Sequence, residues 1–321
     1  MTSPSQPNPS FQIVQSEHLS PGPAAWLRER ATLIECPHDS PDFHNVMAQA
    51  DGLIVRTYTQ VNQALIERSP QLRVVGRAGV ALENIDIPAC RARGIEVVHA
   101  PGSNAQAVVE YVLCLLCDAL RPRIAVTSPL DSESWERVRA ETFAHTQMSE
   151  MSLGILGLGR IGKRIAHVAR SIGFDVYYND IIDIPEGQRN GAQPLAPKEL
   201  FARCDVISVH IDSRPGNHHF VNESLIAAMK PTALLLNTSR GLAIDHAALA
   251  AFLHANPKSR AMIDVHDPEP FTADYPLLGC SNATLLPHLA GRTETALTNM
   301  SWVVRDVLAV LQGNPPQHPA P

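Results

Sequence analysis

The 321-residue sequence has no apolar run of the length that crosses a membrane, and it has no run of basic residues. Its first ten residues are polar and proline-rich, and they lack the basic and apolar regions of a signal peptide. Because the net charge is −6, nucleic acid is not an expected partner, and neither is a membrane. We expect residues 1–10 to form a disordered tail.

Cysteine is sparse, and the six residues of this type are scattered along the chain. Cys114 and Cys117 form a C-x-x-C, but it lies within the apolar stretch YVLCLLCDAL. We expect these two residues to fill the core on a buried helix, without redox or zinc chemistry. The 14 histidines show no spacing of metal ligands, so no metal site is expected. Together with the missing signal peptide, this cysteine usage predicts a cytoplasmic location.

A glycine motif occupies residues 152–162, which read SLGILGLGRIG. Gly157, Gly159 and Gly162 match G-x-G-x-x-G between an apolar strand and a helix. A second strand, FDVYY, follows, and Asp180 comes 18 residues after Gly162. A carboxylate at this place can bind both ribose hydroxyls of NAD and would repel a 2′-phosphate. The motif therefore predicts NAD as cofactor, with an ordinary strand–helix turn as the alternative.

Short apolar strands alternate with helices on both sides of this motif. Such alternation predicts an α/β protein with parallel sheets covered on both faces. One strand–helix unit is complete before the motif, and a helix expected over 293–312 can return to it. We therefore expect a discontinuous substrate domain over 11–101 plus 292–315, into which a cofactor domain over 102–291 is inserted. Residues 316–321 are expected to be a second disordered tail.

Six motifs occur in one order along the chain, namely VVGRAGVALENIDI, NAQAVVEYVL, GLGRIG, LLLNTSRGLAID, AMIDVHDPEP and LLPHLAG. In these motifs the sequence resembles the NAD-dependent D-2-hydroxyacid dehydrogenase family, which includes phosphoglycerate and hydroxypyruvate/glyoxylate enzymes. The resemblance implies two doubly wound domains, a Rossmann cofactor domain inserted into a flavodoxin-like substrate domain. It also implies a homodimer that pairs through the cofactor domain, with the helix from Asn104 as the candidate surface.

Three residues carry the chemistry that the resemblance implies. His288 would protonate the developing alkoxide during reduction of a 2-oxo acid, and Glu269 would orient its imidazole. Arg240 would grip the substrate carboxylate and polarise the 2-oxo group. The alternatives are a surface or capping histidine, a solvated loop glutamate and a surface ion-pair arginine. Asp267 competes with Glu269 for the role of imidazole partner.

The resemblance assigns further residues to the ligands. For the substrate these are the backbone of Ala78, Gly79 and Val80, with Arg56 available for a second charged group. For the cofactor they are Gly157, Gly159, Arg160, Ile161, Gly162, Asp180, His210, Ile211, Thr238, Asp264 and Ala290. Ala81 and Glu83 depart from the family's usual glycine and aspartate, which leaves the identity of the acid open.

We therefore expect an oxidoreductase that moves a hydride between NAD(H) and a small D-2-hydroxy acid or its 2-oxo acid. Two alternatives remain open at this point. One is a dehydrogenase of another small anion such as phosphite. The other is an NAD(H)-sensing binding protein of the co-repressor type. Formate is disfavoured, because formate enzymes of this superfamily replace the glutamate partner of the histidine with glutamine.

Overall fold

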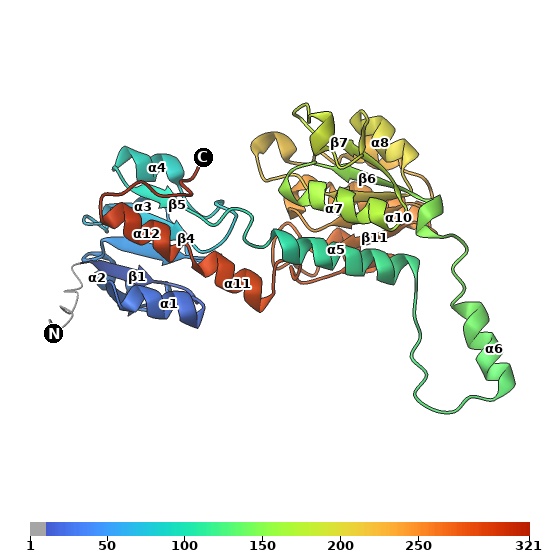
Figure 1. The fold of residues 1–321 in the computed structure, drawn as a ribbon, viewed down its shortest axis with the longest axis horizontal. Coiled ribbons are helices and arrows are strands. Elements are labelled where there is room, and N and C mark those ends of the chain that lie inside the picture. The colour runs from blue at the N-terminus through green and yellow to red at the C-terminus, as the bar shows by residue number, and fades with distance from the viewer. Residues whose placement is uncertain (1–10) are drawn as a thin grey trace. The chain divides into compact units, whose positions relative to one another are not determined.

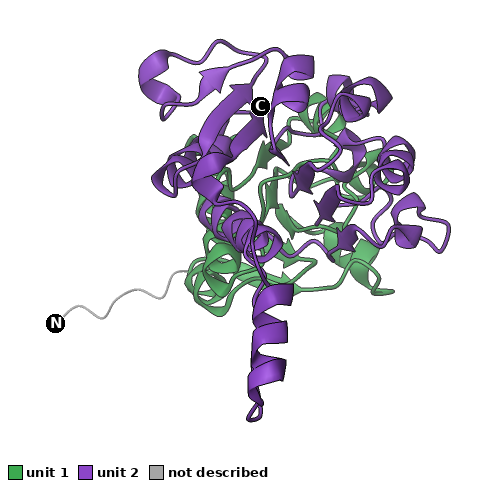
Figure 2. Ribbon diagram, turned by 90° about the vertical axis from the view of Figure 1, so that its right-hand side faces the viewer, with its two compact units in different colours: residues 1–104, 292–321 green, residues 105–291 purple. Residues whose placement is uncertain are grey.

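The computed structural model describes residues 11–321, so the expectation for residues 1–10 lies outside it. The chain divides into two compact units. Unit 1 contains the segments up to Asn104 and from Arg292 onward, and unit 2 spans Ala105–Gly291 (Figure 2). No helix among the described residues is long and apolar enough to cross a membrane.

Unit 1 is built on a five-stranded parallel sheet with the order β2-β1-β3-β4-β5 (Figure 1). The strands are β1 (Gln12–Gln15), β2 (Thr32–Glu35), β3 (Gly52–Val55), β4 (Val74–Arg77) and β5 (Glu96–Val98). This is the doubly wound order typical of flavodoxin-like folds, in which the winding reverses between β1 and β3. Ligands of such sheets bind beyond the carboxyl ends of the strands at that reversal.

Helices cover both faces of this sheet, as the near-continuous apolar strands require. One face packs against α2 (Phe43–Met47), α3 (Gln63–Glu67) and α4 (Ile87–Ala92). The other face packs against α1 (Pro21–Arg28) and α12 (Val304–Leu311). Val307 of α12 lies so close to β4 that a Cβ on Gly76 would come within 2.3 Å of it. Each fully buried aliphatic side chain of α12 stabilises this contact by about 1.5–3 kcal/mol.

The helix expected over 293–312 is interrupted. It forms as α11 (Glu294–Ser301) and α12, separated by Trp302 and Val303. Ser301 explains the break, because its buried hydroxyl donates back to the carbonyl of Leu297 and also binds Ser20. Such back-bonding to the preceding turn bends helices.

The expectation of a disordered tail over 316–321 is wrong. Pro319 forms an antiparallel bridge with Val98 of β5, and the N–H of Ala320 donates to the carbonyl of Val97. The buried Asp306 of α12 accepts hydrogen bonds from the N–H of Gln317 and from the ring of His318. The proline content of this tail concealed an edge-strand pairing, which proline tolerates at positions whose N–H is not needed.

Unit 2 contains a seven-stranded parallel sheet with the order β12-β11-β10-β9-β6-β7-β8. The strands are β6 (Ser152–Leu156), β7 (Asp175–Asn179), β8 (Gln193–Pro194), β9 (Val206–Val209), β10 (Leu234–Asn237), β11 (Arg260–Ile263) and β12 (Ala283–Leu285). The winding reverses between β6 and β9, where the glycine motif ends β6. The two parallel sheets confirm the predicted α/β fold with two doubly wound domains.

Each face of this second sheet has its own layer of helices. α5 (Ala105–Leu120) and α7 (Arg160–Ser171) share one core with the sheet. α8 (Pro197–Arg203), α9 (Glu223–Ala227) and α10 (His246–Ala255) share the other. α6 (Ser132–Glu141) has no buried residue.

The expectation that Cys114 and Cys117 fill the core is wrong. Cys114 is exposed and Cys117 is half-buried. Cys114 and Cys117 lie four and seven residues after the exposed Glu110. This helical spacing places all three residues on one side of α5. Most apolar residues of α5 are buried on the opposite side of the helix. The side that carries Cys114 and Cys117 is therefore left facing solvent.

Candidate active site

The glycine turn has the backbone geometry that a diphosphate site needs. Gly157 has a φ of +96°, and a Cβ there would come within 2.7 Å of the His210 carbonyl oxygen. A Cβ on Gly162 would come within 2.2 Å of the Gly157 carbonyl oxygen. Gly159 instead faces open space, so that a ligand can approach the backbone and the first N–H groups of α7. Each of the three glycines thus meets a different requirement of a dinucleotide loop.

Asp180 follows β7 and contacts this turn directly. One carboxylate oxygen accepts the N–H of Leu158 at 2.7 Å, and the other accepts the N–H of Ile182 at 3.2 Å. The acid is therefore fixed beside the glycine turn, where the motif predicts the ribose of NAD. Its contact with a ribose remains a prediction.

We expect Asp180→Asn to raise the ratio of NADPH to NADH turnover by about tenfold, which corresponds to ~1.4 kcal/mol. Asparagine keeps an oxygen that can accept the N–H of Leu158, but it removes the charge that repels a 2′-phosphate. The measurement is kcat/KM with each cofactor at a fixed 2-oxo acid concentration. Asp175→Asn, at the exposed start of β7, serves as the control. A strong preference of the unaltered protein for NADPH would contradict the role of Asp180.

Two further side chains on the cofactor side of the sheet fit a bound group. The hydroxyl oxygen of Thr238 is buried and has no hydrogen-bond partner among residues 11–321. An orphaned buried hydroxyl at the end of β10 suits a ligand that would supply the partner. His210 at the end of β9 lies 2.7 Å from the Ser208 hydroxyl, and burial lowers its pKa to about 3. Its imidazole is therefore neutral at physiological pH.

The predicted catalytic residues follow three strands that are neighbours in the sheet. Arg240 follows β10, Glu269 follows β11, and His288 follows β12. Nδ1 of His288 lies 2.7 Å from Oε2 of Glu269. A Cβ on Gly241, next to Arg240, would come within 2.0 Å of the His266 carbonyl. The structure thus brings the segments that carry all three residues to one edge of the sheet.

The electrostatics of Glu269 favour a charged carboxylate. Burial would raise its pKa, but the hydrogen bonds from His288 and from the N–H of His266 outweigh burial. The pKa of Glu269 therefore lies below its usual value. Asp267, the competing partner in the sequence analysis, does not make this contact to His288 in the structure, which favours Glu269.

Asp264 is fully buried at the end of β11 and holds the loop that carries His288. Its two oxygens accept the N–H groups of Leu289 and Ala290, each at 2.8 Å. Burial raises the pKa of this carboxyl, and the two N–H groups partly oppose that rise. The geometry gives Asp264 a loop-holding role, which is an alternative to a cofactor contact. The contact with the cofactor remains a prediction.

Unit 1 presents its own polar groups beyond the carboxyl ends of β3 and β4. The N–H of Ala78 donates to Val55, and that of Gly79 donates to Arg77, so both are already engaged within unit 1. The Arg77 side chain occupies the space beside Gly79, where a Cβ would lie within 1.3 Å of its guanidinium. The carbonyls of Gly79 and Val80 are held by Ala100 and by the ring of His99. Carboxylate binding by this loop remains a prediction.

Arg56 lies at the winding reversal of unit 1, and Glu17 organises the loop around it. The Glu17 carboxylate accepts the N–H groups of residues 56 to 59. Burial would raise the pKa of Glu17, but these four donors lower it below its usual value. Nη1 of Arg56 is buried and has no hydrogen-bond partner among the described residues. Burial lowers the pKa of Arg56, the Glu17 carboxylate partly opposes this effect, and the nearby charge of Arg292 adds to it.

Three residues with a positioning role were not predicted from the sequence, namely Glu17 in unit 1 and Asn237 and His266 in unit 2. The fully buried Asn237 binds the Arg240 carbonyl and accepts from the N–H and hydroxyl of Ser239, which shapes the turn before Arg240. A single polar residue that ends an apolar strand is the signal that could have indicated it. Glu17 and His266 have no such signal, because their partners are distant in sequence or are backbone atoms.

Most of the chain is similar in sequence to known proteins. The family model for the NAD binding domain of D-isomer specific 2-hydroxyacid dehydrogenases matches residues 113–290. D-3-phosphoglycerate dehydrogenase of Mycobacterium bovis is 34% identical over 92% of this chain, which spans 57% of that protein's length. (S)-sulfolactate dehydrogenase of Chromohalobacter salexigens is 36% identical over 79% of this chain and 82% of its own.

The similarity extends to solved structures. The structure of D-mandelate dehydrogenase from Rhodotorula graminis matches with a TM-score of 0.84 and 25% identity, over 97% of this chain and 98% of that one. The region matched by the family model lies within unit 2 and contains the glycine turn and Asp180, and NAD is the cofactor of this region. The chain belongs to the D-isomer specific 2-hydroxyacid dehydrogenase family.

Proposed function

We propose that the protein is a dehydrogenase that interconverts a small D-2-hydroxy acid and its 2-oxo acid. The observation that carries this proposal is the Glu269–His288 pair at 2.7 Å, on the sheet edge that also bears the glycine turn. NADH, when bound, supplies the hydride for reduction. Because Nδ1 of His288 is engaged by Glu269, Nε2 is the ring atom that donates a proton to the substrate oxygen.

Arg240 provides the binding part of this mechanism. Its guanidinium can hold a carboxylate through two hydrogen bonds, which fixes the adjacent carbon for reaction. The test is NADH oxidation with a panel of 2-oxo acids. Turnover with at least one acid supports the proposal. Tight NADH binding with no turnover of any acid contradicts it and favours a sensor.

We propose further that the preferred acid carries a second anionic group, for which Arg56 and Arg292 supply positive charge. Two observations on residues 11–321 support this proposal. Nη1 of Arg56 is buried and has no hydrogen-bond partner there, and Glu17 is the one acid among the charges that shift the pKa of Arg56. Two relatives named above are named for acids with such a group, a phosphate and a sulfonate. Arg292 adds a second cation near Arg56.

We expect Arg56→Gln to raise KM by about tenfold or more for 2-oxo acids with a phosphate or sulfonate, because a charge-assisted hydrogen bond is worth ~1.5–3 kcal/mol. Acids without a second anion should show a much smaller change. The measurement is KM for matched acids of both kinds. Arg68→Gln, an exposed arginine at the end of α3, serves as the control. An equal rise for both kinds of acid would contradict the second-anion site.

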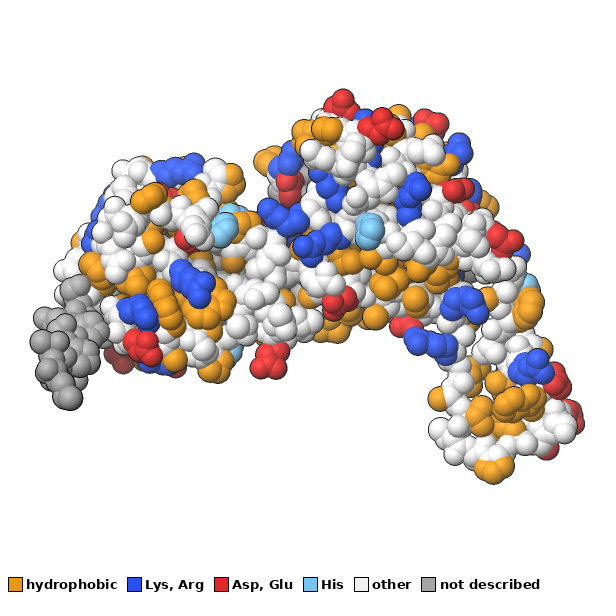
Figure 3. Space-filling model, viewed as in Figure 1, with side chains coloured by type: hydrophobic (Ala, Val, Ile, Leu, Met, Phe, Trp, Pro, Cys, Tyr) orange, Lys and Arg blue, Asp and Glu red, His pale blue; other side chains and the backbone are white. Residues whose placement is uncertain are grey.

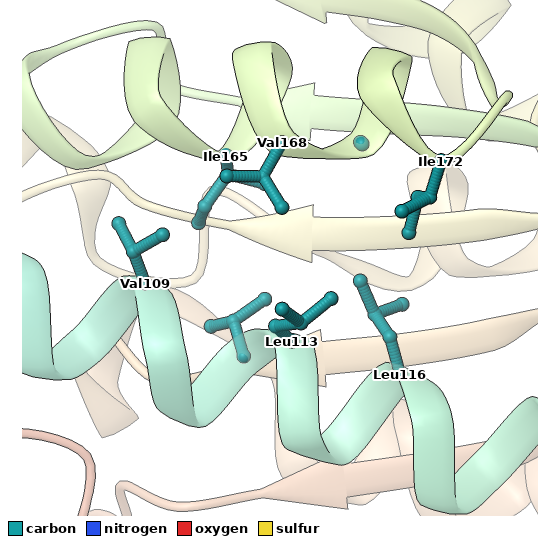
Figure 4. A pocket seen from close by; sticks show the side chains of 8 residues that line it. Val109, Leu113, Leu116, Ile165, Val168 and Ile172 are labelled. Atoms are coloured by element: carbon teal, nitrogen blue, oxygen red, sulfur yellow. The ribbon is translucent and has the colours of Figure 1, made fainter.

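We propose a homodimer that pairs through unit 2. A hollow between α5 and α7 is lined only by apolar side chains, among them Val109, Leu113, Leu116, Ile165, Val168 and Ile172 (Figure 4). Hydrophobic side chains gather over α5 and again on α6 (Figure 3). Trp135 is 51% exposed on α6, and Phe143 just beyond it is 67% exposed. Exposed apolar patches of this kind are typical of an interface between subunits.

We expect the protein to sediment as a dimer and Trp135→Glu to shift it toward the monomer at low micromolar concentration. A buried negative charge would then oppose the contact that the tryptophan makes. Leu278→Glu changes a side chain of similar exposure elsewhere in unit 2 and should leave the dimer intact. A monomeric unaltered protein would contradict the proposal. The cytoplasmic location also remains a prediction, which fractionation of the producing cells would test.

A further inference from the structure

His266 contacts the segments that carry both members of the catalytic pair. Its backbone N–H donates to Oε1 of Glu269 at 2.7 Å. Its ring Nε2 lies 2.8 Å from the carbonyl oxygen of Leu286, two residues before His288. Its ring Nδ1 lies 3.0 Å from the hydroxyl of Tyr275. His266 thus contacts the acid through its backbone N–H and the loop of the imidazole through its ring.

These contacts assign the proton on the ring of His266. A carbonyl oxygen only accepts, and so Nε2 is the donor to Leu286. Nδ1 then accepts the hydroxyl proton of Tyr275. The ring is only 7% exposed and packs edge-on against Phe271 and Tyr275, at centroid distances of 4.7 Å and 5.3 Å. Hydrogen bonds and packing together leave it a single orientation.

The loop that carries His288 needs such support. His288 has a φ of +53°, in the left-handed region that non-glycine residues rarely adopt. A residue stays in this region only where the surroundings hold it there. Asp264 holds the loop from the C-terminal side, through the N–H groups of Leu289 and Ala290. The His266 ring holds it from the N-terminal side, through the carbonyl of Leu286.

We propose that His266 is a positioning residue that sets the His288 imidazole against the Glu269 carboxylate. The inference rests on the proposed dehydrogenase function. His266 does not touch the reacting atoms in this assignment and acts through the two loops. The titratable groups that face it or the pair are Glu269, His288, Asp264, Asp267, His246 and Tyr275.

The test compares His266→Phe with Tyr275→Phe. Phenylalanine at 266 keeps the ring packing and the backbone N–H to Glu269, but it removes the donor to Leu286. We expect kcat to fall by about tenfold, because small displacements of catalytic groups lower rates strongly. NADH affinity, measured by fluorescence titration, should stay unchanged, and the pH profile of kcat should shift. Tyr275→Phe leaves the Nε2 contact in place and should keep both the wild-type pH profile and most of the activity.

Rescue distinguishes positioning from a general loss of stability. Glutamine at 266 can extend an amide N–H toward Leu286, whereas the shorter asparagine cannot reach as far. We expect His266→Gln to recover much of kcat and His266→Asn to recover little, with thermal unfolding recorded for each variant. If the Phe variant does not fold, this Gln–Asn pair carries the test, and equal kcat values in the two would overturn the proposal.

A folded His266→Phe with wild-type kcat and pH profile would also overturn it. In that case, inactivity of His288→Ala would show that the dehydrogenase proposal still stands. Full activity of His288→Ala would instead refute the dehydrogenase mechanism itself.

Discussion

Replacement of His288 by alanine is expected to lower kcat for 2-oxo acid reduction by about 10²–10⁴-fold, the range for loss of a general acid. Nδ1 of the imidazole lies 2.7 Å from the Glu269 carboxylate, which leaves Nε2 of the ring for the substrate. NADH binding should be unaffected, because the glycine turn and Asp180 lie beyond other strands of the sheet. The measurements are steady-state turnover and NADH titration by fluorescence.

Glu269→Gln provides a second test of the catalytic pair, and His167→Ala provides a control. The pKa of Glu269 lies below its usual value, so the side chain is ionised at neutral pH and favours the protonated imidazole. Glutamine removes that charge, and reductive activity should move to lower pH. His167 is an exposed histidine of α7, and its loss should leave turnover unchanged. Retention of activity in His288→Ala would refute its role as the acid.

Replacement of Arg240 by alanine is expected to lower kcat/KM for the 2-oxo acid by about 10²–10³-fold, because a truncated charge pair costs ~2–5 kcal/mol. The loss should appear mainly in KM if the arginine only grips the carboxylate. It should appear in kcat as well if the guanidinium also polarises the 2-oxo group. Separate values of kcat and KM for one acid distinguish these cases.

Arg240→Lys separates the effect of the positive charge from that of the two parallel N–H donors. Lysine keeps the positive charge but cannot offer two parallel N–H groups to a carboxylate, so an intermediate loss is expected. Arg203→Ala removes an exposed arginine at the end of α8, which hydrogen-bonds Tyr177, and should leave kcat/KM unchanged. Equal activity of the alanine variant and the unaltered protein would remove Arg240 from the mechanism.

The fold class was predictable because its signals are local. Buried parallel strands require continuous apolar runs such as GLIV and LLLN, and the connecting helices require apolar residues at helical spacing. The glycine turn was predictable for the same reason, since Gly157 and Gly162 occupy positions where a Cβ would collide with backbone. Asp180 then followed from its distance along the chain.

The incorrect predictions concern features that depend on partners distant in the sequence. Ser301 interrupts a helix through contacts that include Ser20, 281 residues away. The C-terminal tail is held by Asp306 and by an open edge at β5, neither of which its proline-rich composition reveals. Cys114 looked buried because apolar residues surround it in sequence, although the helix turns it outward.

The sequence by itself determined the fold class, the cofactor motif and the residue types of the predicted catalytic set, because each depends on spacing along one element. Only the tertiary structure decided which carboxylate meets His288, that Asp264 and His266 hold the loop around it, and that Glu17 occupies the N–H groups beside Arg56. These contacts join the ends of different strands, and the packing of the sheet sets the distances between those ends.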